Sequence, residues 1–258
     1  MGILIHVKNA SFEANAIAFI PPVSEGLEYM NFFGSNASKA ARNLAPGKPA
    51  AGLVGTPTHN AHSSIFLPGT NYVVTSVDDV ESMTLIAVAK PLADASTLLI
   101  SNFNGPRAAG VGTTYGKVLD FESGGVIDGL VSSKAFSPRW DGINSVSVSP
   151  GVGIPGNAAM TPVGEWRAIV GRSRESDKTL SVFNKTAGLS GSTVMTQMPD
   201  LGAAKMRIGG TAVANGGSFA NSVEIAAAAI YSRALSDDEI SKVYSFLKGY
   251  YARRGIAI

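Results

Sequence analysis

The sequence of 258 residues contains no cysteine, and only 16% of its residues are charged. The absence of cysteine excludes a disulfide scaffold and a cysteine-ligated zinc site. An ordinary globular domain has about 25% charged residues, whereas here 21 basic and 19 acidic residues leave a net charge of +2. Because so small a charge cannot neutralise many phosphates, we expect no nucleic-acid partner.

Long apolar runs are also missing. The longest, residues 225–231, is far shorter than the roughly 20 residues of a membrane-spanning helix, so we expect no membrane span. Residues 1–23 have no basic region before an apolar stretch, and His6, Lys8 and Glu13 interrupt them. This pattern argues against a secretory signal peptide, and we expect synthesis in a cytoplasm.

The sequence is rich in turn formers and short apolar segments. It has 29 glycines, 13 prolines and 45% hydrophobic residues, enough for a core without disulfides at this length. Short segments of branched and apolar residues alternate with clusters of Gly, Pro, Asn and Ser, which is typical of a β-sandwich or barrel. The predicted strands include residues 83–90, 97–101, 117–121, 146–148, 166–170 and 179–183.

One helix is predicted, at the C-terminal end. Ser236 and Glu239 have the spacing of a capping box, in which each side chain binds the backbone N–H of the other residue. Gly255 can end the helix. An apolar stripe at helical spacing predicts the face that packs on the sandwich: Ile240, Val243, Tyr244, Leu247 and Tyr251.

The C-terminal third resembles a known family. Residues 206–210 (MRIGG), 230–240 (IYSRALSDDEI) and 251–256 (YARRGI) resemble the closing strands and short helix of concanavalin A-like, laminin G-like jelly rolls. Residues 165–170, led by Trp166, resemble a core strand of that family. The resemblance implies an all-β fold over residues 25–258, a two-sheet antiparallel jelly-roll sandwich with one short C-terminal amphipathic helix.

Residues 1–24 lie outside this resemblance and form a predicted N-terminal arm. Pro21 and Pro22 cannot donate hydrogen bonds to a sheet and keep the chain extended. Two interpretations stay open. The arm is either an extra edge strand of the same domain or a docking segment for another subunit.

Catalytic carboxylates are poorly represented. Some relatives are glucanases, and the resemblance implies a strand carrying Glu-x-Asp-x-x-Glu. The nearest match begins at Glu175 and Asp177, but Leu180 replaces the second glutamate and the segment predicts a turn. Asp120 and Glu122 do not fit that pattern either. We therefore expect no enzymatic activity.

Metal ligands are sparse. His59 and His62 have a His-x-x-His spacing, but they lie in a predicted loop without a third ligand, which favours an ordinary polar loop over a zinc site. The resemblance implies calcium at the rim of some relatives. Asp120, Asp128 and Asp141 are candidate ligands by residue type alone, and no other cofactor is expected.

Two polar loops carry the residue types of a sugar site, which combines an aromatic platform with nearby polar groups. Trp140 as an ordinary core residue is the alternative. The candidate residues are Arg139, Trp140, Asp141 and Asn144 in one loop, and Asn104, Arg107 and Tyr115 in the other.

A sandwich without cysteine and with an added arm resembles bacteriophage virion proteins. This resemblance implies a non-enzymatic surface protein of the virion, in a tail fibre, spike or capsid, that binds host or environmental glycans. Residues 1–24 would contact other virion proteins, and the chain would form a homo-oligomer. The alternatives are a purely structural decoration or adaptor protein without a sugar site and, third, a glycan-cleaving enzyme.

Overall fold

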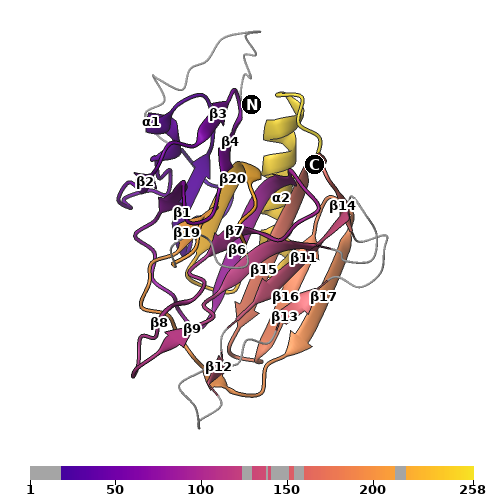
Figure 1. Cartoon of the computed structure of the whole chain (residues 1–258). Helices are drawn as coiled ribbons and strands as arrows, with labels where there is room; N and C mark the ends of the chain where they lie inside the picture. Colours follow the sequence, from indigo (N-terminus) through magenta and orange to yellow (C-terminus); the bar gives the residue numbers. More distant parts are fainter. Residues whose placement is uncertain (1–18, 124–129, 138, 141–150, 154–159, 213–218) are drawn as a thin grey trace.

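The computed structural model describes residues 19–123, 130–137, 139–140, 151–153, 160–212 and 219–258. Two antiparallel sheets, each with eight strands in the described ranges, pack face to face (Figure 1). A four-residue helix, α1 (Ala37–Ala40), follows the first strand, and a longer helix, α2 (Asp237–Ala252), lies near the C-terminus.

The first sheet carries α2 on its outer face, and we call it the helix-covered sheet. Its strands, in spatial order, are β17 (Leu189–Val194), β16 (Thr179–Asn184), β15 (Arg167–Arg174), β6 (Met83–Pro91), β20 (Val223–Tyr231), β4 (Ser63–Phe66) and β3 (Thr58–Asn60), with β1 (Leu27–Phe32) also paired to β20.

The second sheet is called here the opposite sheet. Its strands, in spatial order, are β13 (Gly151–Gly153), β11 (Leu130–Phe136), β10 (Val118–Ser123), β7 (Thr97–Ser101), β19 (Arg207–Ile208), β5 (Tyr72–Val74) and β2 (Gly52–Val54), with β14 (Thr161–Pro162) also paired to β11. Two small ladders stand apart: β8 (Gly105–Pro106) with β9 (Thr113–Thr114), and β12 (Arg139–Trp140) with β18 (Met198–Pro199).

The main core fills the space between the sheets. Alternate residues of each strand point inward, as the two-residue period of a strand requires. Leu85, Ile100, Ile169 and Val182 are predicted core residues that lie in this cluster. The predicted core residue Leu98 is also buried, but it is not part of this cluster. Its cross-strand partner is Asp120, and both residues lie on the face of the opposite sheet that points away from the main core. A shift in the β10–β7 register beside Asp120 accompanies this change.

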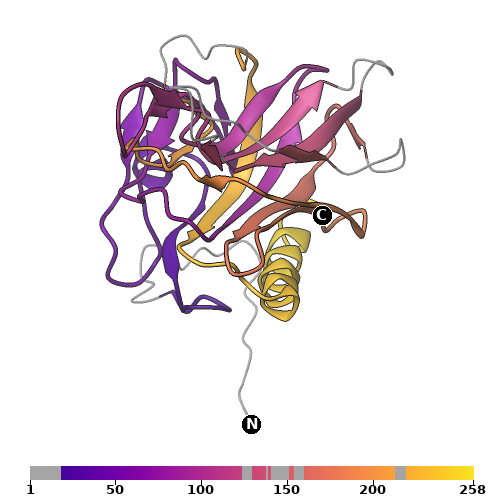
Figure 2. The same cartoon turned by 90° about the horizontal axis from the view of Figure 1, so that it is seen from below.

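A second core lies between α2 and the outer face of the helix-covered sheet (Figure 2). Ile240, Val243, Leu247 and Tyr251 are buried, and the capping box of Ser236 with Glu239 is present. The predicted stripe is therefore confirmed at these four positions. Tyr244 is only half-buried, and the ammonium groups of Lys185 and Lys248 lie over its ring.

The predicted fold class is confirmed: the chain forms a two-sheet antiparallel jelly-roll sandwich with one C-terminal amphipathic helix. Residues 146–148, a predicted strand, lie outside the described ranges.

The position of Trp166 differs from its prediction as the first residue of a core strand. It is half-buried, just before β15, and the Lys90 ammonium lies 4.9 Å from the centre of its ring. It packs at the margin of the second core rather than inside the sandwich.

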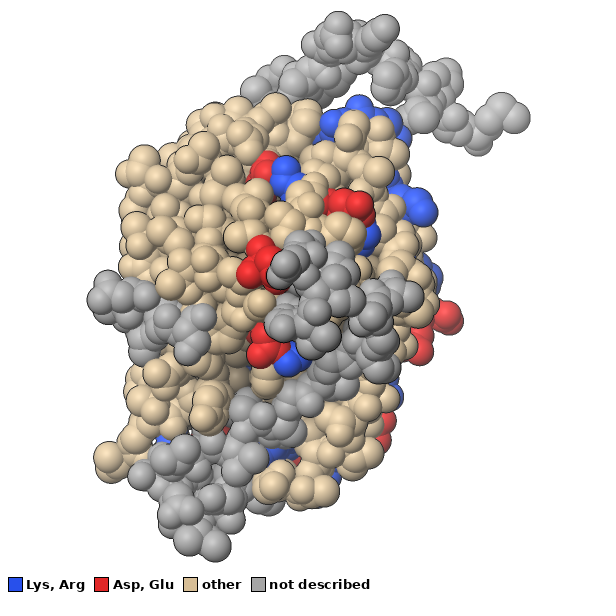
Figure 3. Space-filling view, turned by 45° about the vertical axis from the view of Figure 1, so that its right-hand side comes forward, with Lys and Arg blue, Asp and Glu red and all other residues tan. Residues whose placement is uncertain are grey.

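On the face shown in Figure 3, acidic and basic groups lie in the middle and along the right side, and the broad left-hand part is made of uncharged residues. This distribution agrees with the low charge content of the sequence.

The described start of the arm packs against the body, because Phe19 contacts Phe32 and Phe246 at ring-centre distances of 5.7 and 5.9 Å. Residues 1–18 lie outside the described ranges, so the docking role stays a prediction.

Candidate functional site

The described parts of the two predicted sugar-binding loops lie at the same end of the sandwich, at the bottom of Figure 1 beside β8, β9 and β12. Residues 198–200 join them. Met198 and Pro199 pair with Trp140 and Arg139 in the small β12–β18 ladder. The next residue, Asp200, binds Arg107 of the other predicted loop, which also carries Asn104 and Tyr115. The sequence does not predict this contact, because the two loops and residues 198–200 lie far apart in the chain.

Arg107 and Asp200 form a buried ion pair. The Arg107 Nε lies 2.7 Å from Asp200 Oδ1, and the two side chains are 9% and 2% exposed. The Thr114 hydroxyl donates to the Asp200 carbonyl at 3.1 Å, and the Ala203 N–H donates to the Pro106 carbonyl at 2.8 Å. These contacts fix the β8–β9 hairpin against residues 200–203.

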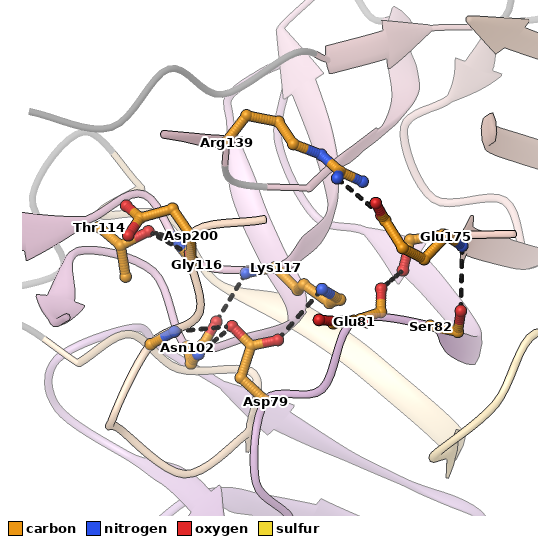
Figure 4. Close-up of polar contacts among 12 residues, drawn as sticks. Asp79, Glu81, Ser82, Asn102, Thr114, Gly116, Lys117, Arg139, Glu175 and Asp200 are labelled. Atoms are coloured by element: carbon orange, nitrogen blue, oxygen red, sulfur yellow. Dashed lines mark hydrogen bonds and ion pairs between the residues drawn. The ribbon is translucent and has the colours of Figure 1, made fainter. Parts of the chain in front are cut away.

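A buried polar network lies beneath the hairpin (Figure 4). Lys117 Nζ lies 3.2 Å from Asp79 Oδ1, while Asp79 Oδ2 accepts from Asn102 Nδ2 at 3.1 Å and from the Gly202 N–H at 3.0 Å. The Lys117 N–H donates to Asn102 Oδ1 at 2.7 Å. A Cβ at Gly116 would lie 2.3 Å from Asn102 Oδ1, so glycine is required there for close packing.

Sequence reasoning did not find this network. Asp79 and Lys117 lie in separate segments, and neither falls in a motif that signals their contact. Buried charges need partners because the loss of hydration is costly, and here each charge meets an opposite one. The network therefore gives the hairpin a rigid base, which a binding loop needs if it is to be pre-organised.

Three aromatic rings gather on the hairpin and the neighbouring chain. Phe103 lies 6.3 Å from Tyr115 and 5.0 Å from Phe219 between ring centres. Tyr115 is 44% exposed, and both phenylalanines are half-buried. Asn104 is exposed, with a positive φ of 56°, and its N–H donates to the Tyr115 carbonyl at 3.4 Å. A partly open aromatic surface thus stands beside a polar amide.

Arg139 occupies a different environment from the one expected of a sugar ligand. Its side chain is 1% exposed, and its Nη1 lies 2.7 Å from Glu175 Oε2. Its Nε and Nη2 contact the Met195 sulfur at 3.2 and 2.8 Å. This burial makes Arg139 a residue that fixes the loop. The backbone of Trp140 is paired in β12, but its side chain, with Asp141 and Asn144, lies outside the described residues.

Glu175 and Asp177, the two carboxylates of the nearest match to the glucanase pattern, are engaged in ion pairs. Glu175 binds Arg139, and Asp177 lies 3.0 Å from the Arg174 guanidinium in the turn between β15 and β16. The predicted turn is confirmed. Desolvation raises the pKa of Asp177, but the hydrogen bonds from Thr179 and Arg174 together outweigh it and hold this pKa below its usual value.

Asp120 is the one calcium candidate that the structure describes. It is fully buried on β10, and neither carboxylate oxygen has a hydrogen-bond partner in the part of the chain that the structure describes. Burial raises the pKa of Asp120 to about 8, while the charge of Lys134 opposes this effect. Lys134 itself pairs with Glu122. Over the described residues, no three His, Asp or Glu side chains cluster as a metal site, and Asp128 and Asp141 lie outside them.

His59 differs from its prediction as a loop residue. It lies in β3, where its Nδ1 is 2.9 Å from the Ser64 hydroxyl of β4. His62 is exposed in the turn that connects the two strands. The hairpin pairs Asn60 with Ser63, so this region is a short antiparallel ladder. In the part of the chain that the structure covers, neither helix could span a membrane.

Comparison with known proteins supports the fold. No family model and no curated protein matches the sequence. Among solved structures, the Trypanosoma rangeli sialidase in complex with sialic acid matches with a TM-score of 0.55 at 15% identity, over 85% of this chain and 32% of the sialidase. The botulinum neurotoxin serotype D binding domain matches with a TM-score of 0.56 at 10% identity, over 87% of this chain and 52% of that domain.

The chain thus spans about a third of the sialidase and about half of the toxin domain. At these identities the likeness establishes a shared β-sandwich fold.

Proposed function

We propose that the chain is a non-enzymatic glycan-binding protein. Its site would be the end of the sandwich that carries the β8–β9 hairpin, which we call the hairpin end. The observation that carries this proposal is the aromatic cluster of Phe103, Tyr115 and Phe219, with Tyr115 44% exposed. Sugar rings have apolar faces that pack on aromatic side chains, and polar groups nearby fix their orientation. Asn104 provides such a group beside Tyr115.

Rigidity of the hairpin supports the same proposal. The Arg107–Asp200 pair and the Asp79–Lys117 pair hold the loop before any ligand arrives. A pre-organised site loses less conformational entropy on binding. Trp140 belongs to the β12–β18 ladder, which Asp200 connects to the hairpin, and Asp141 and Asn144 come after it in the sequence. We propose that these three residues extend the site.

The structural neighbours are compatible with this role. One is a sialidase in complex with sialic acid, and another is the binding domain of a neurotoxin. A binding role is favoured over hydrolysis because Glu175 and Asp177, the nearest match to a glucanase motif, lie in a turn. Retaining hydrolysis needs two carboxyl groups about 5–5.5 Å apart on either side of the scissile bond, whereas these two pair with different arginines.

A location on the surface of a bacteriophage virion is the finer part of the proposal, and it rests on the sequence resemblance. A tail fibre, spike or capsid-surface component would present the hairpin end to host or environmental glycans. Residues 1–24 would contact other virion proteins, and a homo-oligomer would present several copies of the site.

A structural decoration or adaptor role is the second candidate. The observation in its favour is the start of the arm, where Phe19 packs between Phe32 and Phe246 and Ile20 is 86% exposed. Deleting residues 1–18 tests it while leaving the Phe19 contacts in place. Loss of virion incorporation or of oligomerisation would support docking by the arm, and unchanged incorporation and oligomerisation would contradict it.

A glycan array tests the binding proposal. Wild type and Tyr115→Ala are compared, with Tyr244→Ala as the matched control because Tyr244 is a half-buried tyrosine on α2. We expect wild type and the control to bind the same glycans and Tyr115→Ala to lose them. The absence of any glycan signal with wild type would contradict the proposal.

A further inference from the structure

Arg207 differs from the two other arginines of the hairpin end. Arg107 and Arg139 each pair with a carboxylate, Asp200 and Glu175. Arg207, on β19, has no acidic partner among the residues that the structure describes. Its Nη1 donates to the Thr211 carbonyl, and its buried Nε has no hydrogen-bond partner within the described ranges. A buried donor left unpaired is costly, so the Arg207 guanidinium has hydrogen-bonding capacity that the described residues do not use.

Closely packed residues surround the Arg207 guanidinium, and we call Tyr72, Gly210 and Ser101 the seat of Arg207. Its Cζ lies 5.2 Å from the centre of the Tyr72 ring. Gly210 packs closely against Tyr72, since a Cβ added at Gly210 would lie 2.6 Å from the Tyr72 Cβ. The Gly210 carbonyl accepts from the Ser101 hydroxyl at 2.7 Å. The Tyr72 ring, itself packed against the backbone, restricts the position of the guanidinium, and an arginine held in place loses less freedom when it binds a carboxylate at two points.

Thr211 connects this seat to the aromatic cluster. Its carbonyl accepts from Arg207, and its hydroxyl donates to the Phe103 carbonyl at 3.0 Å. The Ala212 N–H donates to the same carbonyl at 3.0 Å. Arg207 also pairs across the ladder with Ser101, two residues before Phe103. The seat and the aromatic cluster are therefore neighbours in the fold, joined through Thr211.

We propose that Arg207 is a carboxylate-binding subsite and that the ligand is a glycan bearing a carboxylate, such as a uronic or sialic acid. The sugar ring packs on the aromatic cluster, and the carboxylate accepts hydrogen bonds from Arg207. This inference rests on the proposed function and names the ligand class of the same site. An arginine fork binds the planar carboxylate in two places, whereas a neutral hydroxymethyl group leaves one donor unpaired.

The test compares acidic sugars with their carboxyl-reduced forms. The probes are sialyllactose and trigalacturonate, each titrated by calorimetry into wild type, Arg207→Gln and Arg207→Lys. We expect wild type to bind at least one acid about tenfold more tightly than its reduced form. Arg207→Gln removes this preference while keeping the affinity for the reduced form, and Arg207→Lys restores part of it. Lys242→Gln, the same charge change on an exposed face of α2, leaves the preference intact.

Equal affinity of wild type for each acid and its reduced form would overturn the inference, as would binding of neutral array glycans only; in both cases the proposed glycan binding would stand. If wild type bound no glycan at all, the proposed function itself would fail. The comparison of ligands needs no mutation, so it holds even if an Arg207 variant folds poorly. As a second readout, the Nε–H signal of Arg207 in ¹⁵N NMR shifts with the acid and not with the reduced sugar.

Discussion

Arg107 and Asp200 form an ion pair of 2.7 Å, almost wholly buried, that joins the β8–β9 hairpin to the segment after β18. Through this contact, the segments that carry Arg107 and Arg139, which are 32 residues apart in the chain, meet at one end of the sandwich. The position of the hairpin, and of the aromatic rings that it carries, depends on this pair.

Removal of the Asp200 carboxylate takes away the acidic group that binds the buried Arg107 side chain. We expect Asp200→Ala to lower the free energy of unfolding by about 3–5 kcal/mol, the range for breaking a buried pair. Asp78→Ala, which breaks the exposed pair with Lys205, serves as the control and changes stability by less than about 1 kcal/mol. Urea unfolding measures both. Equal effects of the two variants would show that the buried pair has no special role.

Gly209 should tolerate no side chain. Its φ is +66°, and a Cβ would lie 2.3 Å from the Phe66 Cβ. We expect Gly209→Ala to destabilise the fold by at least about 2 kcal/mol, because strain and overpacking add. Gly249→Ala on α2 is the matched control, since a Cβ there meets nothing within 4 Å. That change should stabilise the helix by up to about 1 kcal/mol. Thermal unfolding tells them apart, and a loss of stability in both variants would contradict this account.

Asp120 makes stability depend on pH. Burial raises its pKa to about 8, whereas the pKa of an unfolded aspartate is about 3.9. Between these values the folded state binds more protons than the unfolded state, so stability falls as pH rises from about 4 to 8 and is constant above.

The variant Asp120→Asn removes this titration. We expect its melting temperature to fall less than that of wild type between pH 5 and pH 8, and to exceed that of wild type at pH 8. Asp78→Asn, at an exposed aspartate, keeps the slope of wild type. An unchanged slope in Asp120→Asn would mean that Asp120 is not protonated in the folded protein.

Local signals predicted the helix and several strands. The capping box at Ser236 and the stripe from Ile240 to Tyr251 depend on residues within a few turns of one another, and the structure has both. The predicted strand 97–101 coincides with β7, and 83–90 lies within β6. Such patterns are readable because the side-chain period of each element is set by its own backbone.

The arrangement of the site was less accessible to sequence reasoning. Asn104, Arg107 and Tyr115 were selected by residue type, and the structure brings them together on one hairpin. The partner of Arg139 is Glu175, 36 residues away, and nothing near Arg139 in the chain signals its burial. Arg207 is a further case, because its partners lie on β5 and in the turn after β19. Long-range contacts of this kind depend on the packing of both sheets.

Aromatic stacking by Tyr115 is the central claim, and the affinities of Tyr115→Phe and Tyr115→Ala for the best array glycan test it most directly. The account predicts that Tyr115→Phe stays within about threefold of wild type, because the ring is kept. Tyr115→Ala should weaken binding at least about tenfold, or about 1.4 kcal/mol, with the melting temperature of both variants close to that of wild type. Equal affinity of Tyr115→Ala and wild type would contradict it.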